Sequence, residues 1–158
     1  GEQIYESMCA HTKITRSEAK TRAMDLFDKL NFKDSQRVWD SYPFELSGGM
    51  NQRAGIAIAM LMNPPILFAD EPTSALDVTT QAQIVRQMME LRDDFGTGII
   101  IVTHNIGVAA YMADQLVVMQ NGKVVDQGTR DEVMEHPTSD YTKKLLAAVP
   151  EMEGQRYV

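Results

Sequence analysis

The stretch from Ile66 to Asp77, which reads ILFADEPTSALD, constrains this chain more than any other part of it. It begins with an apolar run that has the composition and length of a β-strand buried on both faces, although periodicity alone does not exclude a helix. The run stops at two adjacent carboxylates, Asp70 and Glu71, and Pro72 then ends any regular element because it has no N–H to donate. Two acids at the end of a buried strand cost free energy unless a cation or a protic ligand uses them.

Two explanations of this carboxylate pair are open. In open parallel sheets, ligands bind at the edge formed by the carboxyl ends of the strands. At such an edge Asp70 could hold Mg²⁺, directly or through water, and Glu71 could polarise an attacking water, as phosphoryl transfer requires. The alternative is a strand that simply ends in polar residues at the surface. The rest of the sequence is needed to distinguish a ligand site from such a polar strand end.

A second apolar run, residues 99–102, lies a helix-length away from the first. The pattern of residues 79–95 predicts that intervening helix, so the three elements form a βαβ unit with parallel strands and a right-handed crossover. The carboxyl ends of both strands then share one edge of the sheet. Because His104 follows the second run, we expect it to lie beside Asp70 and Glu71. A histidine after a strand is more often structural, but its position opposite two carboxylates favours a functional site.

Ser47, Gly48 and Gly49 precede an apolar helix predicted from about Asn51 to Met62. Ser47 suits the N-cap, and two glycines at a helix start let a ligand approach the backbone closely. Free N–H groups and the helix dipole make such a start an anion site. An ordinary serine-capped helix after a glycine turn explains the same residues without a ligand.

The other elements follow from capping and turn signals. Residues 2–10 predict a short helix, and Thr15 with Glu18 forms a capping box that opens a helix to about Leu30. Residues 31–45 are expected to be irregular, with four hydrophobic anchors: Trp39, Tyr42, Pro43 and Phe44. After a short helix at 106–113, strands 115–120 and 123–127 form a hairpin around Asn121-Gly122. A second capping box at residues 129–132 opens the next helix, residues 141–149 form the last one, and residues 150–158 look loose.

Composition excludes several classes of protein. The net charge of −7 argues against a nucleic-acid partner, and no run of Lys and Arg offsets it. Cys9 is the sole cysteine, which fits a reducing compartment. No apolar run approaches the length of a membrane span.

Taken together, these residues resemble the ATP-binding subunits of ABC transporters. Residues 46–50 (LSGGM), 66–71, 74–77 and His104 match, in order and spacing, the signature motif, Walker B, D-loop and switch histidine of that family. The tail from His136 to Pro150 resembles the branch that powers bacterial and archaeal oligopeptide, dipeptide and nickel importers. The implied fold is α/β: part of a P-loop NTPase (RecA-like) parallel sheet, with an all-α helical subdomain.

The resemblance implies a role for each matching residue and implies ATP and Mg²⁺ as cofactors. Asp70 would be the Mg²⁺-associated aspartate, Glu71 the general base, and His104 the contact to the γ-phosphate. The signature residues Ser47, Gly48 and Gly49 would touch ATP bound to the opposite subunit, and Asp77 would communicate across the dimer. Met50 stands where the family usually has Gln, which puts only a side-chain contact to nucleotide in doubt.

One motif of the family is absent from the sequence. No G-x-x-x-x-G-K-[ST] occurs, and Gly122-Lys123 lies in a predicted hairpin without the upstream glycine. That motif cradles the phosphates of ATP. We therefore expect the C-terminal part of an ATPase whose N-terminal part is missing. Alone, this part should neither bind ATP tightly nor hydrolyse it, and it should expose apolar surface and unpaired strand edges.

The resemblance also implies a division of the chain and a set of partners. Residues 1–64 would form the helical subdomain that docks on transmembrane permease subunits, residues 65–128 part of the ATPase core, and residues 129–158 a C-terminal helical extension. A second ATPase subunit would complete the dimer, peripheral to the cytoplasmic face of a prokaryotic membrane. A soluble ABC-type ATPase of translation or DNA repair, and a non-catalytic interaction module, remain as alternatives.

Overall fold

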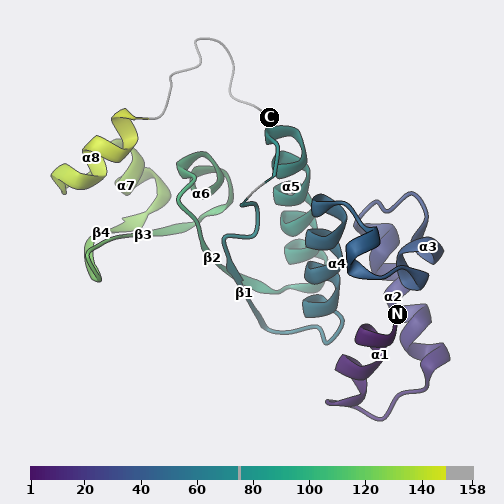
Figure 1. The fold of residues 1–158 in the computed structure, drawn as a ribbon. Coiled ribbons are helices and arrows are strands. Elements are labelled where there is room, and N and C mark those ends of the chain that lie inside the picture. Colours follow the sequence, from purple (N-terminus) through teal and green to yellow (C-terminus); the bar gives the residue numbers. More distant parts are fainter. Residues whose placement is uncertain (75, 149–158) are drawn as a thin grey trace. The chain divides into compact units, whose positions relative to one another are not determined.

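The computed structural model describes residues 1–74 and 76–148, which form two compact units, Gly1–Val102 and the part that begins at Thr103 (Figure 1). Each unit is described by itself. The first contains, in chain order, α1 (Glu2–Cys9), α2 (Arg16–Lys29), α3 (Ser35–Asp40), the 3₁₀ turn η1 (Pro43–Glu45), α4 (Gly48–Met60), β1 (Ile66–Asp70), α5 (Val78–Phe95) and β2 (Gly98–Val102). The second contains α6 (Ile106–Met112), β3 (Gln115–Gln120), β4 (Lys123–Thr129), α7 (Arg130–Glu135) and α8 (Asp140–Ala147).

Side-chain caps fix where α2 and α4 begin. Thr15 and Glu18 form the expected capping box at the start of α2, and the Ser47 hydroxyl accepts a hydrogen bond from the Met50 N–H at the start of α4. Each cap satisfies backbone N–H groups that have no partner inside the helix. At the other end of α5, Gly96 adopts a left-handed conformation with φ of 63°, which terminates the helix.

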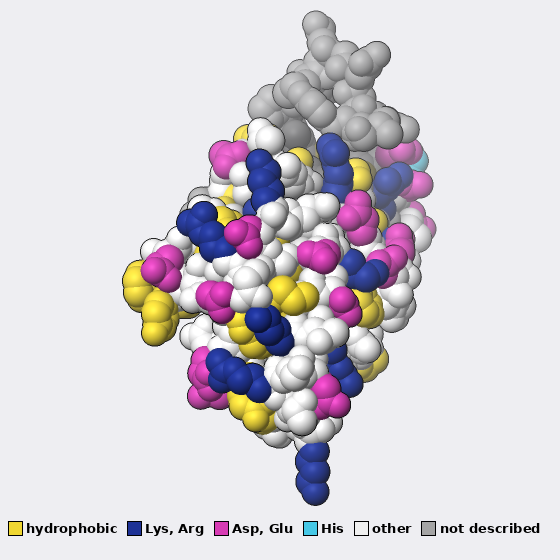
Figure 2. All heavy atoms as spheres, turned by 90° about the vertical axis from the view of Figure 1, so that its right-hand side faces the viewer, with side chains coloured by type: hydrophobic (Ala, Val, Ile, Leu, Met, Phe, Trp, Pro, Cys, Tyr) yellow, Lys and Arg dark blue, Asp and Glu magenta, His cyan; other side chains and the backbone are white. Residues whose placement is uncertain are grey.

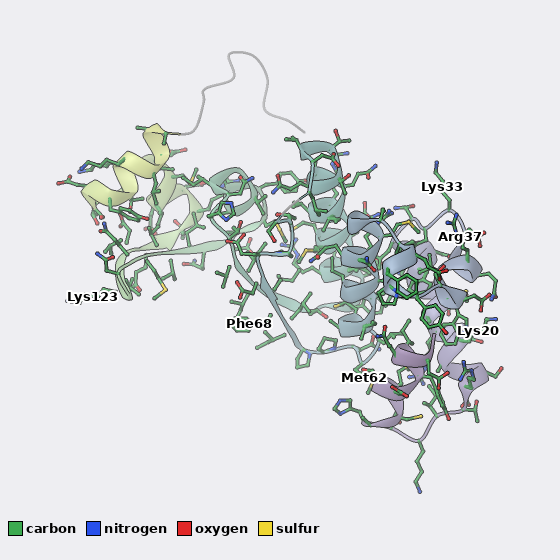
Figure 3. The ribbon with its side chains drawn as sticks, viewed as in Figure 1. Lys20, Lys33, Arg37, Met62, Phe68 and Lys123 are labelled. Atoms are coloured by element: carbon green, nitrogen blue, oxygen red, sulfur yellow. The ribbon has the colours of Figure 1, made fainter. Side chains whose placement is uncertain are left out.

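Strands β1 and β2 pair in parallel, as the βαβ pattern predicts. The register runs from Ile66 opposite Gly98 to Asp70 opposite Val102, so both strands end together. The expectation that β1 is buried on both faces is wrong. Leu67 and Ala69 face the helices and are buried, whereas Phe68, labelled in Figure 3, is 68 % exposed.

The outer face of this two-stranded sheet therefore exposes apolar side chains. Ile66 and Phe68 on β1 are exposed, as are Ile100 and Val102 on β2. Among the described residues the sheet has two strands only, so each strand leaves one edge unpaired. This confirms the expectation of exposed apolar surface and open strand edges. The apolar composition of the strand predicts burial on both faces. Whether a face is in fact buried depends on which other elements cover it.

The core of the first unit lies among its helices. Fully buried side chains come from α1, α2, the turn after α2, α4 and α5: Met8, Phe27, Leu30, Met60, Ile84 and Met88. Phe27 packs edge-to-face against Phe32, with ring centroids 5.0 Å apart. This helical packing holds α4, and with it the signature residues, against α5.

Residues 31–45 are more regular than expected. The Asp34 carboxylate caps α3 by accepting from the Arg37 N–H, and η1 follows. Trp39 is buried, as an anchor should be. The expectation that Tyr42, Pro43 and Phe44 are anchors is wrong, because all three are exposed. Tyr42 and Phe44 instead stack on each other with ring centroids 5.4 Å apart, so the apolar rings cover one another rather than the core.

The second unit is built on the predicted hairpin. β3 and β4 pair antiparallel, with an irregularity between Val118 and Met119. Asn121 and Gly122 adopt φ of 51° and 75°, the left-handed conformations that this two-residue turn requires. Thr129 and Glu132 form the predicted capping box of α7.

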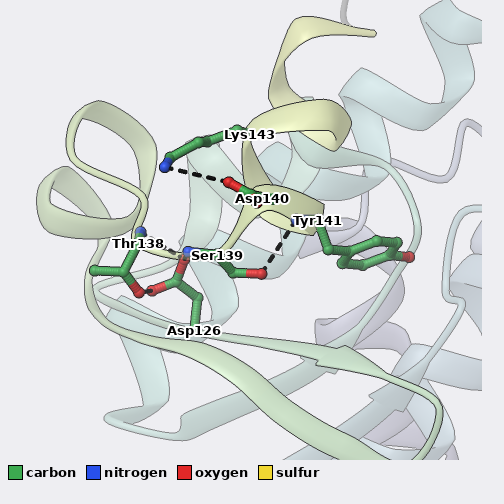
Figure 4. A network of polar contacts seen from close by, with 6 residues as sticks. All are labelled: Asp126, Thr138, Ser139, Asp140, Tyr141 and Lys143. Atoms are coloured by element: carbon green, nitrogen blue, oxygen red, sulfur yellow. Dashed lines mark hydrogen bonds and ion pairs between the residues drawn. The ribbon is translucent and has the colours of Figure 1, made fainter.

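Asp126 joins the hairpin to the segment that leads into α8 (Figure 4). It is 8 % exposed, and its carboxylate accepts hydrogen bonds from the Thr138 N–H, the Thr138 hydroxyl and the Ser139 N–H at 2.9–3.0 Å. Ser139 then caps α8 through the Tyr141 N–H. The bond from the Ser139 N–H, together with those from Thr138, holds the pKa of Asp126 below its usual value, against the opposing effect of burial.

This network makes the docking of α8 sensitive to acid. Because folding lowers the pKa of Asp126, its contribution to stability is complete above the pKa of an unfolded aspartate, about 3.9, and is lost as the pH falls through the lower folded pKa. In an acid titration followed by the NMR amide signals of α8, we expect Asp126→Asn to release α8 already at neutral pH. Asp140→Asn removes an exposed carboxylate whose ion pair, among the described residues, is with Lys143, and it should leave α8 docked. Equal behaviour of both variants would contradict the role of Asp126.

Two kinds of expectation are not tested by this structure. Val149 and residues 150–158 lie outside the described residues. The division at residues 64 and 128 concerns function and stays a prediction.

Within the described residues no helix is both long and apolar enough to cross a bilayer. On the face seen in Figure 2, basic and acidic side chains are intermixed rather than gathered into a broad patch of one sign.

Candidate functional site

Asp70 and Glu71 lie at the carboxyl edge of the β1–β2 sheet, where the sequence predicts a ligand. Asp70 is the last residue of β1 and is exposed. Glu71 continues the pairing, because its N–H donates to the Val102 carbonyl at 2.8 Å. The end of β1 is therefore fixed against the end of β2 up to and including Glu71.

The backbone of Glu71 is in an uncommon conformation. Its φ of 47° lies in the left-handed region, which a non-glycine residue occupies at a cost in free energy. Bonds on both sides hold it there: its N–H is paired with β2, and its carbonyl accepts from the Ser74 N–H at 3.1 Å and the Ser74 hydroxyl at 3.0 Å. Such strain persists only where the surroundings impose it, and it is common at functional sites.

The signature residues lie at the start of α4, against the start of α5. Ser47 is the N-cap, and Gly48 and Gly49 open the helix, so their N–H groups are among those without a partner inside it. A Cβ at Gly48 would lie 3.7 Å from Leu76, and a Cβ at Gly49 would lie 2.6 Å from Thr80 Cγ2. The structure thus brings the signature residues together with the residues that flank Asp77.

Asp77 caps α5. One carboxylate oxygen accepts from the Thr80 N–H at 2.9 Å and the other from the Thr80 hydroxyl at 2.7 Å. These bonds, the one from the Thr80 N–H first, lower the pKa of Asp77, so the residue is a carboxylate at neutral pH. Within this chain Asp77 therefore has a structural task beside the role across a dimer that the resemblance implies.

The close approach of Gly49 to Thr80 yields a paired prediction. Gly49→Ala should destabilise the protein by about 1–3 kcal/mol, because its methyl group meets a side chain that is tied to Asp77. At Gly55, in the same helix, a methyl group would meet nothing within 4 Å beyond its chain neighbours and the backbone of its own helix, so Gly55→Ala should stabilise by about 0.5–1 kcal/mol. Urea unfolding measures both changes.

A second substitution tests the cause. Thr80→Ser removes the Cγ2 methyl but keeps the hydroxyl that bonds Asp77, so it should recover most of the stability lost in Gly49→Ala. If Gly49→Ala unfolds at the same urea concentration as the unchanged protein, the close packing of α4 on α5 is wrong.

Sequence reasoning missed Arg53, which connects α4 to the turn after α2. Its Nε donates to the Gly49 carbonyl at 3.3 Å, and its Nη1 donates to the carbonyls of Leu30 and Asn31 at 3.3 and 3.4 Å. Its guanidinium also lies 4.8 Å from the ring centroid of Phe32. Partial burial lowers the pKa of Arg53. The spacing of four residues from Gly49 was the available signal, but the two carbonyls come from a segment distant in sequence.

His104 belongs to the second unit and follows Val102 by two residues. His104 lies in one unit and the carboxylates of Asp70 and Glu71 lie in the other, and each unit is described by itself. The contact between them therefore stays a prediction. Among the described residues no group of three or more His, Cys, Asp or Glu side chains is placed to hold a metal ion by itself. Asp70 is exposed at the sheet edge, which fits a metal that is held partly by a ligand's own oxygens.

Comparisons with known proteins agree with these motifs. The ABC transporter family model matches residues 2–74. The oligopeptide transport ATP-binding protein AppD of Bacillus subtilis is 43 % identical over 155 residues, which are 98 % of this chain and 47 % of the relative. The glutathione import ATP-binding protein GsiA of Escherichia coli is 43 % identical over 156 residues, which are 99 % of this chain and 25 % of the relative.

A solved structure shows the same fold. The ATP-binding cassette MJ0796, in a dimeric post-hydrolysis state bound to ADP and Pi, is similar with a TM-score of 0.65 and 31 % identity. The match covers 76 % of this chain and 50 % of that one. The chain thus spans about half the length of relatives such as AppD, or less. In sequence and in fold, this chain is therefore similar to a part of the ATP-binding cassette of ABC transporters.

Proposed function

We propose that this chain is part of the ATPase subunit of an ABC importer of the peptide or nickel type. The longer protein to which it would belong, here called the parent, binds Mg·ATP at a subunit dimer interface and uses hydrolysis to drive transport. The observation that carries the proposal is the parallel β1–β2 pair that ends at Asp70 and the strained Glu71. The relatives, named as import ATP-binding proteins, support the importer branch.

Each site residue has a proposed role in the parent. Asp70 holds the Mg²⁺ that ATP brings, Glu71 accepts a proton from the attacking water, and His104 donates to the γ-phosphate. Bound Mg·ATP supplies the phosphoryl group and a cation that spreads its charge. The strained but fixed backbone of Glu71 supports its role, because a general base must hold its position relative to the water.

The start of α4 has a proposed role across the dimer. Ser47, Gly48 and Gly49 bind the γ-phosphate of ATP held by the opposite subunit, through N–H groups and the positive end of the helix dipole. This contact does not use the side chain of Met50, so the departure from the family's Gln leaves it intact. Asp77, which holds the adjacent start of α5, links this contact to the other subunit's site.

The helical part of the first unit is the proposed docking surface for the permease subunits. A groove of about 340 Å³ lies between the start of α1 and the segment from Trp39 to Pro43. Tyr42 lines this groove and stacks on Phe44, and the two rings are 65 % and 83 % exposed. Exposed aromatic rings are the side chains that most often anchor an interface. The parent is accordingly peripheral, at the cytoplasmic face of the membrane.

Membrane fractionation tests this assignment. Co-expressed with its permease subunits, the parent should sediment with the membranes, and the double variant Tyr42→Ala/Phe44→Ala should move mostly to the soluble fraction. Tyr111→Ala, at another exposed ring, serves as the control and should stay with the membranes. A parent that remains soluble in the presence of its permease would favour an ABC-type ATPase of translation or DNA repair.

A further inference from the structure

A pocket of about 660 Å³ lies in the first unit, and of the signature residues only Met50 lines it. Its walls come from four segments: the turn after α2, α3, α4 and α5. The side chains that matter for its chemistry are Lys33, Arg37, Arg53, Arg86, Gln87 and Glu90. None of the roles proposed for the parent uses this pocket.

Gln87 lines the pocket and carries a buried acceptor. The residue is 6 % exposed, and its Nε2 donates to the Leu30 carbonyl at 2.8 Å. Because a carbonyl only accepts, this bond fixes which end of the amide is nitrogen. The other end, Oε1, is buried and has no hydrogen-bond partner among the described residues. A buried acceptor without a donor is unfavourable, so the pocket is suited to a ligand that brings an N–H or O–H.

The pocket also has more positive than negative charge. Lys33 and Arg37, both labelled in Figure 3, and Arg86 on α5 are exposed and make no ion pair or side-chain hydrogen bond within the described part of the chain. Two acids share the pocket: Asp34, whose carboxylate caps α3, and Glu90. In a chain with a net charge of −7, three unpaired cations around one pocket favour an anionic ligand.

Hydrogen phosphate has the two properties that the pocket favours, which are negative charge and a hydrogen-bond donor. It carries negative oxygens for the cations, and at neutral pH it keeps at least one P–O–H that can donate to Gln87 Oε1. Sulfate has similar shape and charge but no proton at neutral pH, so it would leave the acceptor unsatisfied. We propose that this pocket binds free hydrogen phosphate, with Gln87 accepting its O–H and Lys33, Arg37 and Arg86 binding its oxygens.

Calorimetric titration of the 158-residue chain with sodium phosphate and sodium sulfate, at equal ionic strength, tests this proposal. We expect saturable phosphate binding and sulfate binding at least about tenfold weaker, which is the scale of one lost hydrogen bond to a charged group. A parallel titration with glucose 6-phosphate, whose phosphate has mostly lost its last proton at neutral pH, tests the same contact: it should bind more weakly than phosphate, and tighter binding would contradict the role of Gln87. Absence of saturable phosphate binding, or equal binding of sulfate, overturns the proposal.

Variants locate the binding. Arg37→Ala and Arg86→Ala change exposed side chains and should each weaken phosphate binding about tenfold. Gln87→Met removes the acceptor at similar length and should abolish the preference for phosphate over sulfate. Lys123→Ala, in the hairpin of the second unit, is the matched control and should leave binding unchanged. Phosphate affinity that survives both arginine variants would mean binding elsewhere, for example at the start of α4, and would also overturn the proposal.

Discussion

Glu71→Gln in the parent should reduce ATP hydrolysis by about a hundredfold to ten-thousandfold, the range that a general base contributes. The amide keeps the shape of the carboxyl group but cannot accept the proton of the attacking water. ATP binding should remain, because the proposed contacts to phosphate come from other residues. Steady-state phosphate release and equilibrium nucleotide binding, measured on the same preparation, separate the two effects.

The backbone bonds that hold Glu71 in its conformation do not use its side chain. The strained backbone of Glu71 is held by its N–H bond to Val102 and by the bonds that its carbonyl accepts from Ser74, and none of these involves the side chain. The left-handed conformation also suits Gln about as well as Glu, since neither is β-branched. The fold should therefore be preserved in the variant, and lost turnover would report on chemistry.

A matched control removes a carboxylate elsewhere. Glu135→Gln, at the exposed end of α7, makes the same chemical change away from the sheet edge and should leave hydrolysis unchanged. Turnover by Glu71→Gln at the level of the unchanged parent would refute the general-base assignment. The proposal for Asp70 would survive that result, because metal binding does not depend on Glu71.

Local signals in the sequence predicted the elements that position this site. The strand–helix–strand order predicted the parallel pairing of β1 and β2, and capping residues such as Ser47 and Thr15 predicted where helices begin. Asn121-Gly122 predicted the hairpin of the second unit. The caps and the turn act within a few residues, and the strand–helix–strand order lies within one continuous stretch of the chain. For that reason these signals can be interpreted without knowing the fold.

Features that depend on distant segments were not predicted. Phe68 was expected to be buried and Phe44 to be an anchor, but exposure depends on what covers a side chain and not on its own polarity. The phosphate pocket could not be predicted because Arg86 and Gln87 look like an ordinary face of α5. Only folding brings the turn after α2 next to them.

The second large expected effect concerns this chain without the rest of the parent. The 158 residues contain no G-x-x-x-x-G-K-[ST] to cradle the phosphates. The start of α4 offers a helix dipole worth about 0.3–1 kcal/mol toward an anion, whereas micromolar binding needs about 8 kcal/mol. Asp70 and Glu71 add negative charge, which opposes the phosphates until a metal is bound. We therefore expect the isolated chain to bind Mg·ATP too weakly to detect.

Calorimetric titration of the chain and of the parent with Mg·ATP most directly tests whether this chain is the part of a cassette that lacks its phosphate loop. The titrations are carried out in phosphate buffer. Phosphate fills the pocket proposed to bind it, the one lined by Gln87, so the phosphates of ATP do not produce a binding signal there. We predict saturable binding by the parent and no detectable binding by the 158-residue chain. Tight binding by the chain alone would contradict this assignment, since another element of these residues would then have to hold the phosphates.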